Sequence, residues 1–324
     1  MKKIKKTIKN KLLNSDRGTL LFYKIRTIRE WLALTFIDDY TYVTKEFKKR
    51  YGREIDLKNP QTISEKLQWL KLFYRNNNMP ICSDKYEIRN FLKKYGYDHL
   101  LNEVITVLES DKEIDQLDID SLPDKFVVKA THGSSWNLIC TDKSELDWKL
   151  WKKTFKKWLT LNLYVFGREW NYKELKPKIL IEKFIDHQPL IDYKFMCFNG
   201  EPKYLQINSE DENEKYVDFY DINWQKLEIY KKTFPPTSYE LEKPENFSEM
   251  KKIATDLSEE FPFVRVDFYN FKGRIIIGEL TFFPGGGMSP YYPETDKYES
   301  LFGSYLELPE PNHNLELYSK IQNS

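Results

Sequence analysis

Cysteine and histidine, which build disulfide frameworks and most zinc sites, are scarce in this sequence. The 324 residues include three cysteines and four histidines. An odd number of widely spaced cysteines predicts a reducing compartment and no disulfide framework. No pair of these residues has the spacing of zinc ligands, so a metal site built from them is not expected. They are Cys82, Cys140, Cys197, His99, His132, His187 and His313.

The sequence also lacks a long apolar run and an excess of charge of one sign. No stretch of about 18 apolar residues occurs, so no membrane-spanning helix is expected. Charged residues make up 31% of the chain but nearly cancel at +1, which predicts no nucleic-acid partner. The basic N-terminus has neither the apolar segment nor the cleavage site of a secretory signal. We therefore expect a cytoplasmic protein.

The N-terminal residues stand out by their charge. Residues 1–30 contain ten lysines or arginines and two acids, interleaved with leucines and isoleucines. A basic amphipathic helix at the inner face of the cytoplasmic membrane is one interpretation. A solvated helical arm over residues 1–55, packed on its own domain, is the other, and the irregular apolar stripe favours it. Peripheral membrane contact through residues 1–30 stays open at this point.

Aromatic residues, in contrast, are abundant at 16%. With 40% hydrophobic residues the chain can bury a sizeable core, and global disorder is excluded. Helical signals dominate the first third. We predict one helix from Ser64, as its N-cap, to Tyr74, and another from Ser83 to Gly96. Both belong to a predicted helical and substrate-binding subdomain over 56–122.

From residue 126 onward the pattern changes to strands. Short apolar strands are predicted at 126–129 and 179–185. Asp192–Phe198 and Pro202–Asn208, joined by an Asn199-Gly200 turn, predict a hairpin. An amphipathic helix is predicted over Asn246–Phe261, with Phe247, Met250, Ile253, Ala254 and Leu257 facing inward.

The later chain completes the predicted organisation. Phe263–Tyr269 and Arg274–Phe283 form a second predicted hairpin. We expect one lobe over 123–190 and a larger lobe over 191–308. The polar residues 309–324 are expected to form a loose tail.

The second hairpin carries the strongest chemical signal. Alternation along the strand places Arg265 and Asp267 on one face. A three-residue loop would set Arg265 opposite Glu279, with Asp267 diagonal to it on the same face. Two carboxylates suit Mg²⁺, and an arginine can neutralise charge on a transferred phosphoryl group. An ordinary cross-strand salt bridge between Arg265 and Glu279 would give the same pattern.

Weaker signals accompany this hairpin. The strand ending at Lys129 leads into a loop that could offer backbone N–H groups to phosphate oxygens. Lys194 lies on a half-buried strand, where a charge needs a partner. Glu182 is the acid of an apolar strand whose backbone could read an adenine edge. Three glycines after the carboxylate strand indicate a substrate loop, although a flexible connector would look the same. They are Gly285, Gly286 and Gly287.

Taken in order, these elements resemble the ATP-grasp superfamily, and in particular the TupA-like ATP-grasp family of bacterial surface-polysaccharide gene clusters. The resemblance runs from about Pro60 to about Pro293. The matching motifs are Thr62 with Glu65-Lys66-Leu67-Gln68-Trp69, Asp84-Lys85-Tyr86 with Arg89, Lys129 with His132-Gly133-Ser134, Arg168-Glu169-Trp170 with Tyr172, Glu182, Asp192-Tyr193-Lys194 with Cys197-Phe198-Asn199-Gly200, Arg265-Val266-Asp267 and Gly278-Glu279-Leu280-Thr281.

The resemblance implies an α+β ATP-grasp fold, in which two lobes of antiparallel sheet plus helices clasp the nucleotide beside a helical N-terminal region. It implies ATP and Mg²⁺ as cofactors. Residues implied to bind the nucleotide are Lys85, Lys129, His132, Gly133, Ser134, Ser135, Asn137, Glu182, Lys183 and Phe184. Arg265 and Lys194 would be catalytic. Asp267, Glu279 and Thr281 would hold metal, although many ATP-grasp enzymes have asparagine where Thr281 stands, which makes a second Mg²⁺ doubtful.

The implied activity is that of a carboxylate–amine ligase. ATP would phosphorylate a carboxylate, such as a uronic acid or an amino acid, and an amine would attack the acyl phosphate. A kinase acting on a sugar hydroxyl would use the same charges. A glycosyltransferase is a third interpretation, since Asp118-Ile119-Asp120 has the letters of its metal motif, but these residues lie in a polar link. A binding scaffold without activity would not need Lys129, Asp267 and Glu279 together.

Overall fold

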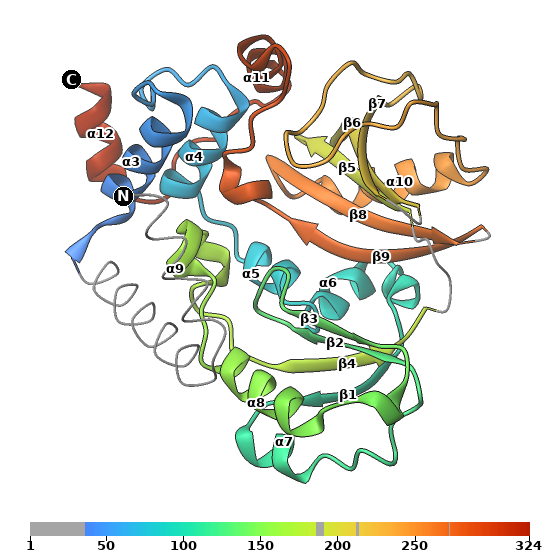
Figure 1. Cartoon of the computed structure of the whole chain (residues 1–324). Helices are drawn as coiled ribbons and strands as arrows, with labels where there is room; N and C mark the ends of the chain where they lie inside the picture. Colours follow the sequence, from blue (N-terminus) through green and yellow to red (C-terminus); the bar gives the residue numbers. More distant parts are fainter. Residues whose placement is uncertain (1–35, 186–190, 212–213, 272) are drawn as a thin grey trace, which may run out of the picture.

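Two antiparallel sheets organise the part of the chain that the computed structural model describes, residues 36–185, 191–211, 214–271 and 273–324. The small sheet has the strand order β1-β4-β2-β3 and the large sheet the order β7-β6-β5-β8-β9. Figure 1 shows the small sheet below the large one, with helices α5 and α6 between them. The strands are β1 (Val104–Leu108), β2 (Phe126–Ala130), β3 (Asn137–Cys140), β4 (Ile179–Lys183), β5 (Asp192–Phe198), β6 (Glu201–Glu210), β7 (Lys215–Asp221), β8 (Phe263–Phe271) and β9 (Arg274–Thr281).

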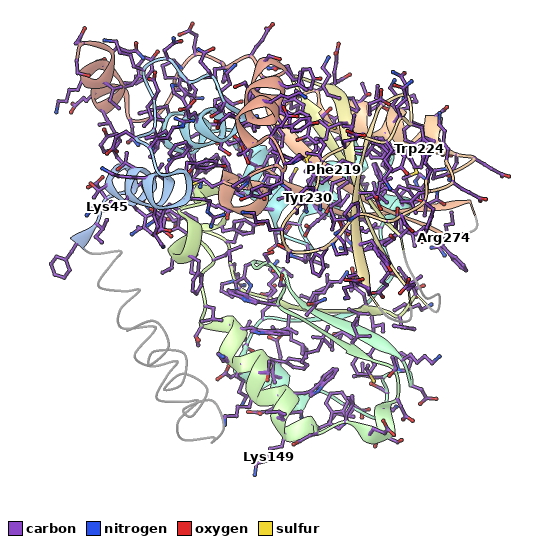
Figure 2. The ribbon with its side chains drawn as sticks, turned by 45° about the horizontal axis from the view of Figure 1, so that its top comes forward. Lys45, Lys149, Phe219, Trp224, Tyr230 and Arg274 are labelled. Carbon is purple, nitrogen blue, oxygen red and sulfur yellow. The ribbon has the colours of Figure 1, made fainter. Side chains whose placement is uncertain are left out.

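The small sheet is covered by its own helices. Helices α7 (Asp111–Gln116) and α8 (Trp148–Leu159) pack against the strands, with the 3-10 turn η2 (Lys143–Glu145) leading into α8. Phe155 of α8 is fully buried there. This lobe therefore has a hydrophobic core separate from the main one. Figure 2 shows the side chains, with Lys149 of α8 at the opposite end of the molecule from Trp224 in the large lobe.

The large sheet has one apolar face and one charged face. Helix α10 (Phe247–Ser258) covers the apolar face, where the ring of Phe247 stacks on Phe195 with 5.6 Å between centroids. All five residues predicted to face inward from this helix are buried, which confirms the predicted amphipathic pattern. Because side chains alternate along a strand, Lys194 and Asp267 lie on the opposite face.

The turn between β5 and β6 is as predicted. Phe198 pairs with Glu201, so Asn199 and Gly200 form a two-residue loop. Their φ angles are 46° and 84°, which is the left-handed conformation that such a turn requires. The Asn-Gly pair therefore sets the pairing next to the turn, and a shift between Met196 and Cys197 changes the register beyond it.

The other described helices come from the N-terminal and C-terminal parts of the chain, except for α9, which follows α8. They are α3 (Asp39–Tyr51), α4 (Ile63–Phe73), α5 (Asn78–Ser83), α6 (Ile88–Lys94), α9 (Tyr164–Gly167), α11 (Thr295–Ser304) and α12 (Leu315–Gln322). The 3-10 turns near them are η1 (Asp98–Leu100), η3 (Trp170–Tyr172) and η4 (Pro284–Gly287). None of the described helices is long and apolar enough to cross a membrane. Most of the predicted basic arm, including residues 1–30, lies outside the described residues.

The start of α4 differs from the prediction. Thr62, not Ser64, is the N-cap, and Thr62 and Glu65 form a reciprocal capping box. Ser64 instead binds Glu299 of α11, through its backbone N–H at 3.0 Å and its hydroxyl at 3.1 Å. Either residue type could cap a helix, and contact with a distant helix decided which one did.

The single helix predicted from Ser83 to Gly96 is also wrong, because the chain breaks at Asp84. This residue has an extended ψ of 121°. Its carboxylate accepts from Tyr86 N at 2.7 Å and from the Thr131 hydroxyl at 2.8 Å. The predicted end is correct, since Gly96 follows α6 with a φ of 74°. The break at Asp84 places the next residue, Lys85, beside the end of β2, where its backbone N–H donates to Thr131 O at 3.2 Å.

The first third of the chain contributes a strand, β1, that was not predicted from the sequence. Strand β1 falls within the region 56–122 that was predicted to be helical, and it pairs with β4 of the small sheet. Just before it, Leu101 forms a parallel bridge to Ile277 of β9. This short segment therefore connects the two sheets.

The predicted register of the second hairpin is wrong. Strands β8 and β9 are paired as far as Phe271, which lies opposite Arg274. The register also shifts between Asp267 and Phe268. Asp267 therefore lies opposite Glu279, where the prediction placed Arg265. The predicted common face is nevertheless present, because Arg265 binds both carboxylates.

The C-terminal residues are not the loose tail that was predicted. The ring of Tyr318 in α12 packs edge-on against Trp69 and Phe73, at centroid distances of 5.9 and 5.5 Å. Before the helix, the backbone N–H of Asn312 donates to Phe73 O at 3.0 Å. The prediction of a loose tail, made from the polar composition, was wrong because a few apolar residues suffice to dock a short helix.

Replacing Tyr318 with alanine should therefore destabilise the protein by about 2 kcal/mol, since a large ring leaves an aromatic cluster. Urea denaturation would measure the change. Leu315→Ala is the matched control, because Leu315 lies on the same helix with 53% of its surface exposed. Equal midpoints for the two variants would contradict the docking seen here.

Candidate active site

A cavity of about 250 Å³ lies between the two sheets and is lined by eight of the eighteen site residues that the sequence predicted. One wall of the cavity comes from the small lobe and from the residue that follows the break at Asp84. It consists of Lys85, Lys129, Ser134, Ser135, Trp136 and Asn137. The opposite side consists of Asp192, Lys194, Asp267, Tyr269, Gly278 and Glu279 of the large sheet. Two separate lobes thus face a common space with lysines on both sides.

Five charged side chains form one network on the large-sheet side. Lys194 Nζ donates to Asp267 Oδ2 at 2.6 Å and also lies 2.5 Å from Asp192 Oδ2. Arg265 Nε donates to Asp267 Oδ1 at 2.6 Å, and its Nη2 reaches Glu279 Oε1 at 2.8 Å. Asp267 is 2% exposed, so its charge is compensated by the lysine and the arginine rather than by water.

The pKa shifts in this network follow from burial and from neighbouring charge. Burial alone would raise the pKa of Glu279, but Lys85, Arg265 and Lys194 lower it to about 2. Burial raises the pKa of Asp192 to about 6, although the lysine beside it acts in the opposite direction. Glu279 therefore keeps its negative charge at neutral pH, and its side chain is 37% exposed towards the cavity.

The structure brings the three predicted metal residues together. Asp267 and Glu279 face each other across β8 and β9, and the Thr281 hydroxyl donates to Glu279 Oε1 at 3.1 Å. No group of three or more histidine, cysteine or acidic side chains suited to a metal exists in the described part of the chain. Two carboxylates are nevertheless a usual protein contribution for Mg²⁺, which takes its other ligands from water and phosphate.

The two lysines on the small-lobe side have different partners. Lys129 forms an ion pair with Glu182 at 2.7 Å, and Glu182 also lies 3.5 Å from Arg89. Lys85 Nζ donates to Gly133 O at 2.5 Å. Burial lowers the pKa of Lys85, while Glu279 raises it. Within the described ranges no carboxylate forms an ion pair with Lys85, so an anionic ligand in the cavity would offset the cost of burying its charge.

The loop after β2 is shaped by packing within the small lobe. A Cβ atom on Gly133 would lie 2.1 Å from the ring of Trp136, so only glycine fits there. His132 is 2% exposed and its Nε2 lies 2.9 Å from Trp158 O. His132 and Gly133 therefore hold the shape of the loop from its buried side. Ser134, Ser135 and Asn137 are exposed and line the cavity.

Lys183 and Phe184, which were also predicted, are not among the residues that line the cavity. Lys183 N donates to Glu103 O at 3.0 Å, and Lys183 O accepts from Asn102 Nδ2 at 2.7 Å. The ring of Phe184 lies 5.8 Å from the ammonium of Lys125. None of these contacts tests the predicted binding of adenine by Lys183 and Phe184, which stays a prediction.

The glycine loop lies away from the cavity, against α4. Gly285, Gly286 and Gly287 have φ angles of 61°, 70° and 71°, which other residues rarely adopt. Gln68 Nε2 donates to the carbonyl oxygens of Gly286 and Gly287, both at 3.0 Å. The loop is therefore held in place by the helical layer, and its predicted role in substrate binding remains untested.

Some cavity residues were not predicted, although signals for them existed. Tyr269 continues the alternation of Arg265 and Asp267, and Asp192 lies two residues before Lys194. Gly278 falls at the register shift, where a Cβ atom would lie 3.2 Å from the ring of Tyr269. Such a bulge depends on strand pairing, so the sequence does not place it, although Gly278 belongs to the motif Gly278-Glu279-Leu280-Thr281.

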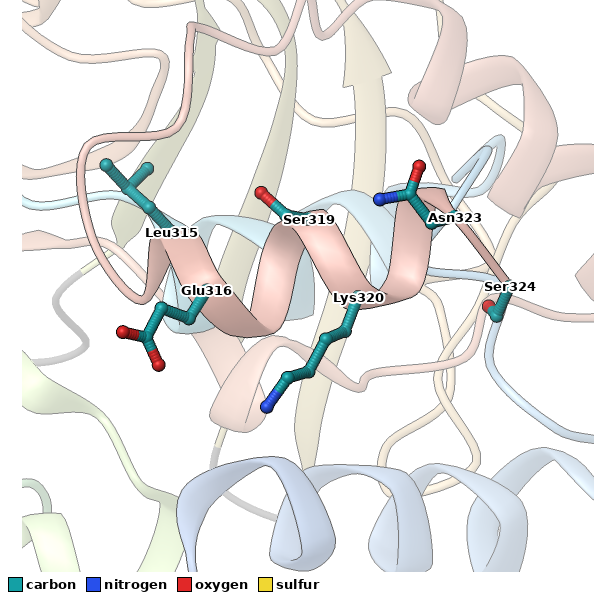
Figure 3. Close-up of a pocket in the computed structure, with 6 residues that line it drawn as sticks. All are labelled: Leu315, Glu316, Ser319, Lys320, Asn323 and Ser324. Carbon is teal, nitrogen blue, oxygen red and sulfur yellow. The ribbon is translucent and has the colours of Figure 1, made fainter.

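Two other features do not form a site of this kind. A wider hollow of about 700 Å³ runs along the outer surface of α12, and the described residues that line it all come from that helix and the chain end (Figure 3). The Asp118-Ile119-Asp120 segment is an exposed turn in which Asp120 N donates to Asp118 Oδ1 at 3.1 Å. Neither faces the cavity between the sheets.

Two antiparallel sheets with their helices, facing each other across this charged cavity, form an ATP-grasp fold. The model of the family described as TupA-like ATPgrasp matches residues 65–307. The chain therefore belongs to this family, as the sequence motifs predicted. No curated protein matches the chain.

Among solved structures, the chain is similar to two D-alanine–D-alanine ligases. The one from Helicobacter pylori is 14% identical, with a TM-score of 0.41, over 78% of this chain and 68% of that one. The one from Bacillus anthracis, complexed with ATP, is 16% identical, with a TM-score of 0.43, over 75% and 68%. The ATP-grasp ligase PsnB, complexed with minimal precursor, Mg and ADP, is 10% identical, with a TM-score of 0.35, over 68% and 58%.

Proposed function

We propose that this chain is an Mg-ATP-dependent ligase, which activates a carboxylate as an acyl phosphate for attack by an amine. One observation carries the proposal: the Asp267–Glu279 pair, bridged by Arg265, faces Lys85 and Lys129 across one cavity. Acidic groups on one side and cations on both sides are what a metal-bound polyphosphate needs.

The small lobe would bind the nucleotide. Lys85 and Lys129 would contact phosphate oxygens, and the exposed Ser134, Ser135 and Asn137 would cover them. Glu182, 4% exposed and already paired with Lys129, would orient that lysine as well as the ribose or adenine end. The backbone of 183–184 would then read the adenine edge.

The large sheet would hold the reacting groups. Asp267 and Glu279, with the weaker ligand Thr281, would hold Mg²⁺. The ion, when bound, would neutralise charge on the transferred phosphoryl group. Arg265 would stabilise the same charge, because its guanidinium is already held in place by the carboxylates of Asp267 and Glu279. Lys194 would bind the γ-phosphate or the carboxylate that attacks it.

The family resemblance supports a pathway as well as a reaction. Its setting in bacterial surface-polysaccharide clusters suggests a uronic acid or an amino acid as the carboxylate, with a second small molecule as the amine. Such chemistry would take place in the cytoplasm. The basic residues 1–30 could bring the enzyme to the inner face of the membrane where polysaccharide precursors are assembled.

Thermal stability with and without Mg-ATP tests the proposal. Mg-ATP or Mg-ADP at about 100 times its Kd should stabilise the protein by about 2.7 kcal/mol, because only the folded state binds. GTP and UDP-sugars are the controls. Phosphate release in the presence of paired uronic acids and amino acids would then identify the substrates. A shift with UDP-sugars alone would contradict the ligase and favour glycosyl transfer.

A further outcome would separate ligase from kinase. A stable phosphorylated sugar with no amide product would show that the acceptor is a hydroxyl, since an acyl phosphate is consumed by the amine.

A further inference from the structure

A second, smaller cavity adjoins the charged face of the large sheet and is lined there by Met196 of β5 and Gln206 of β6. Gln206 lies directly opposite Lys194 across its strand pair, and Met196 lies directly opposite Arg265. The side chains of directly opposite residues share one face of a sheet, with about 5 Å between their Cβ atoms. The small cavity is therefore an immediate neighbour of the charged network.

Helix α4 and the glycine loop also line this cavity. The residues that they contribute are Ile63, Ser64, Leu67, Pro284 and Gly287. A Cβ atom on Gly287 would lie 2.6 Å from Gln68 Nε2, so the close approach of loop and helix requires a glycine. The cavity has a volume of about 30 Å³, and a single water needs about 10–15 Å³. It therefore admits an end group of two or three heavy atoms, such as a carboxylate, but no sugar ring or nucleotide.

Lys231, which follows β7 in the chain, is the one charged side chain among the described residues that line this cavity. Its Nζ donates to Ser289 O at 2.6 Å and to Ser289 Oγ at 3.2 Å, and it lies 3.5 Å from the centre of the Tyr291 ring. Within the described ranges, no carboxylate forms an ion pair with it. The ammonium is thus held in position by neutral groups, and its charge has no direct counter-charge.

The acid whose charge reaches Lys231 is bound elsewhere. This acid is Glu299, and its carboxylate accepts from Ser64 N at 3.0 Å, from the Ser64 hydroxyl at 3.1 Å and from the Tyr51 hydroxyl at 3.2 Å. Burial lowers the pKa of Lys231 to about 7, against the effect of Glu299. A negatively charged ligand group in the cavity would supply the direct partner that Lys231 lacks.

We infer that Lys231 binds a carboxylate of one of the two substrates in this small cavity, at the end of the molecule away from the reacting group. This inference rests on the ligase proposed above. The rest of that substrate runs past Gln206 towards Lys194 and Arg265, which lie on the same face. The bound molecule then belongs to one of two chemical classes. It is an amino acid if it supplies the amine, and a dicarboxylic acid if it supplies the activated carboxylate.

Formate binding to the full chain tests the cavity itself, because formate has three heavy atoms and carries only the carboxylate. In protein labelled with ¹³C at the lysine ε-carbons, the NMR signal of Lys231 is the one that disappears in Lys231→Met. Formate should shift this signal saturably and raise its titration midpoint by about one pH unit, since an anion favours the charged form of the amine. Chloride at equal ionic strength is the control.

The source of the carboxylate is tested in the full chain loaded with Mg-ADP. Thermal-shift titrations would compare each enantiomer of alanine with alaninamide, and succinate with succinamate, so that a carboxylate is replaced by a neutral amide. In one of the pairs the carboxylate should bind about 10-fold to 100-fold more tightly than the amide, and Lys231→Met should abolish this difference. A preference in the alanine pair identifies an amino acid, and one in the succinate pair a dicarboxylic acid.

Two further variants control for effects on folding. Lys232→Met is the matched control, because Lys232 is the next lysine in the chain and is exposed, and it should leave formate binding unchanged. Gln206→Glu keeps the size of the side chain and leaves the bonds between Lys231 and Ser289 in place. Its new carboxylate would compete for the ammonium, so formate should shift the Lys231 signal less than in the wild type.

Two results would overturn the inference: formate shifts the Lys231 signal no more than chloride does, or no pair shows a preference for the carboxylate that depends on Lys231. Either result would leave Lys231 with only the structural role of holding the backbone at Ser289. Failure of the ligase proposal looks different. In that case Mg-ADP gives no thermal shift before any carboxylate is added, whereas the formate titration needs no nucleotide.

Discussion

Replacing Asp267 with alanine is expected to abolish ATP-dependent turnover and to lower the free energy of unfolding by about 3 kcal/mol. The carboxylate is 2% exposed and binds both Lys194 and Arg265. Its loss leaves two buried cations with fewer partners and removes a metal ligand. Turnover and urea denaturation, measured on the same preparation, give the two effects.

A second variant separates the chemical role of Asp267 from its structural role. Asp267→Asn keeps the size of the side chain, so its stability should fall less, but turnover should still be lost because a neutral amide is a poor ligand for Mg²⁺. Asp296→Asn, an exposed acid in the first turn of α11, is the control and should be fully active. An active, well-folded Asp267→Asn enzyme would refute the metal site.

Gly303→Ala should cause the largest loss of stability, more than about 3 kcal/mol. A Cβ atom at Gly303 would lie 2.0 Å from Gln61 O and 2.9 Å from Ile63 N. Both atoms belong to the backbone at the start of α4, so no side-chain rotation can relieve the clash. Urea denaturation midpoints would measure the change.

The neighbouring Ser304→Ala is the control for Gly303→Ala, since Ser304 is exposed on the same helix. The effect should extend to function, because α4 also carries Gln68 and Lys71, which hold the glycine loop. A Gly303→Ala protein with the wild-type midpoint would mean that α11 does not pack on α4 as closely as described.

Features that depend on neighbouring residues could be predicted from the sequence. The Asn199-Gly200 turn follows from the backbone freedom of two residues, and the inward face of α10 follows from helical spacing. Strand alternation placed Arg265 and Asp267 on a common face, which holds whatever the register. For that reason the charged network was predictable while its exact pairing was not.

Features that depend on distant contacts were predicted wrongly or not at all. Glu299 in α11, which is far from Ser64 along the chain, binds Ser64 and so decided which residue caps α4. Docking of α12 required Trp69 and Phe73, and β1 became a strand by pairing with β4. Composition and periodicity carry no information about which distant surface a segment will meet.

The sequence by itself determined the types of residue at the site and the strands and loops that present them. Lys129 stands at a strand end, Lys194 and Asp267 lie on strands whose side chains alternate between two faces, and three glycines follow Glu279. Only the tertiary structure decided that Lys85 faces Glu279 across a cavity and that Asp267 lies opposite Glu279. The physical reason is that propensity and alternation act over a few residues, whereas burial and electrostatic pairing join residues that only folding brings together.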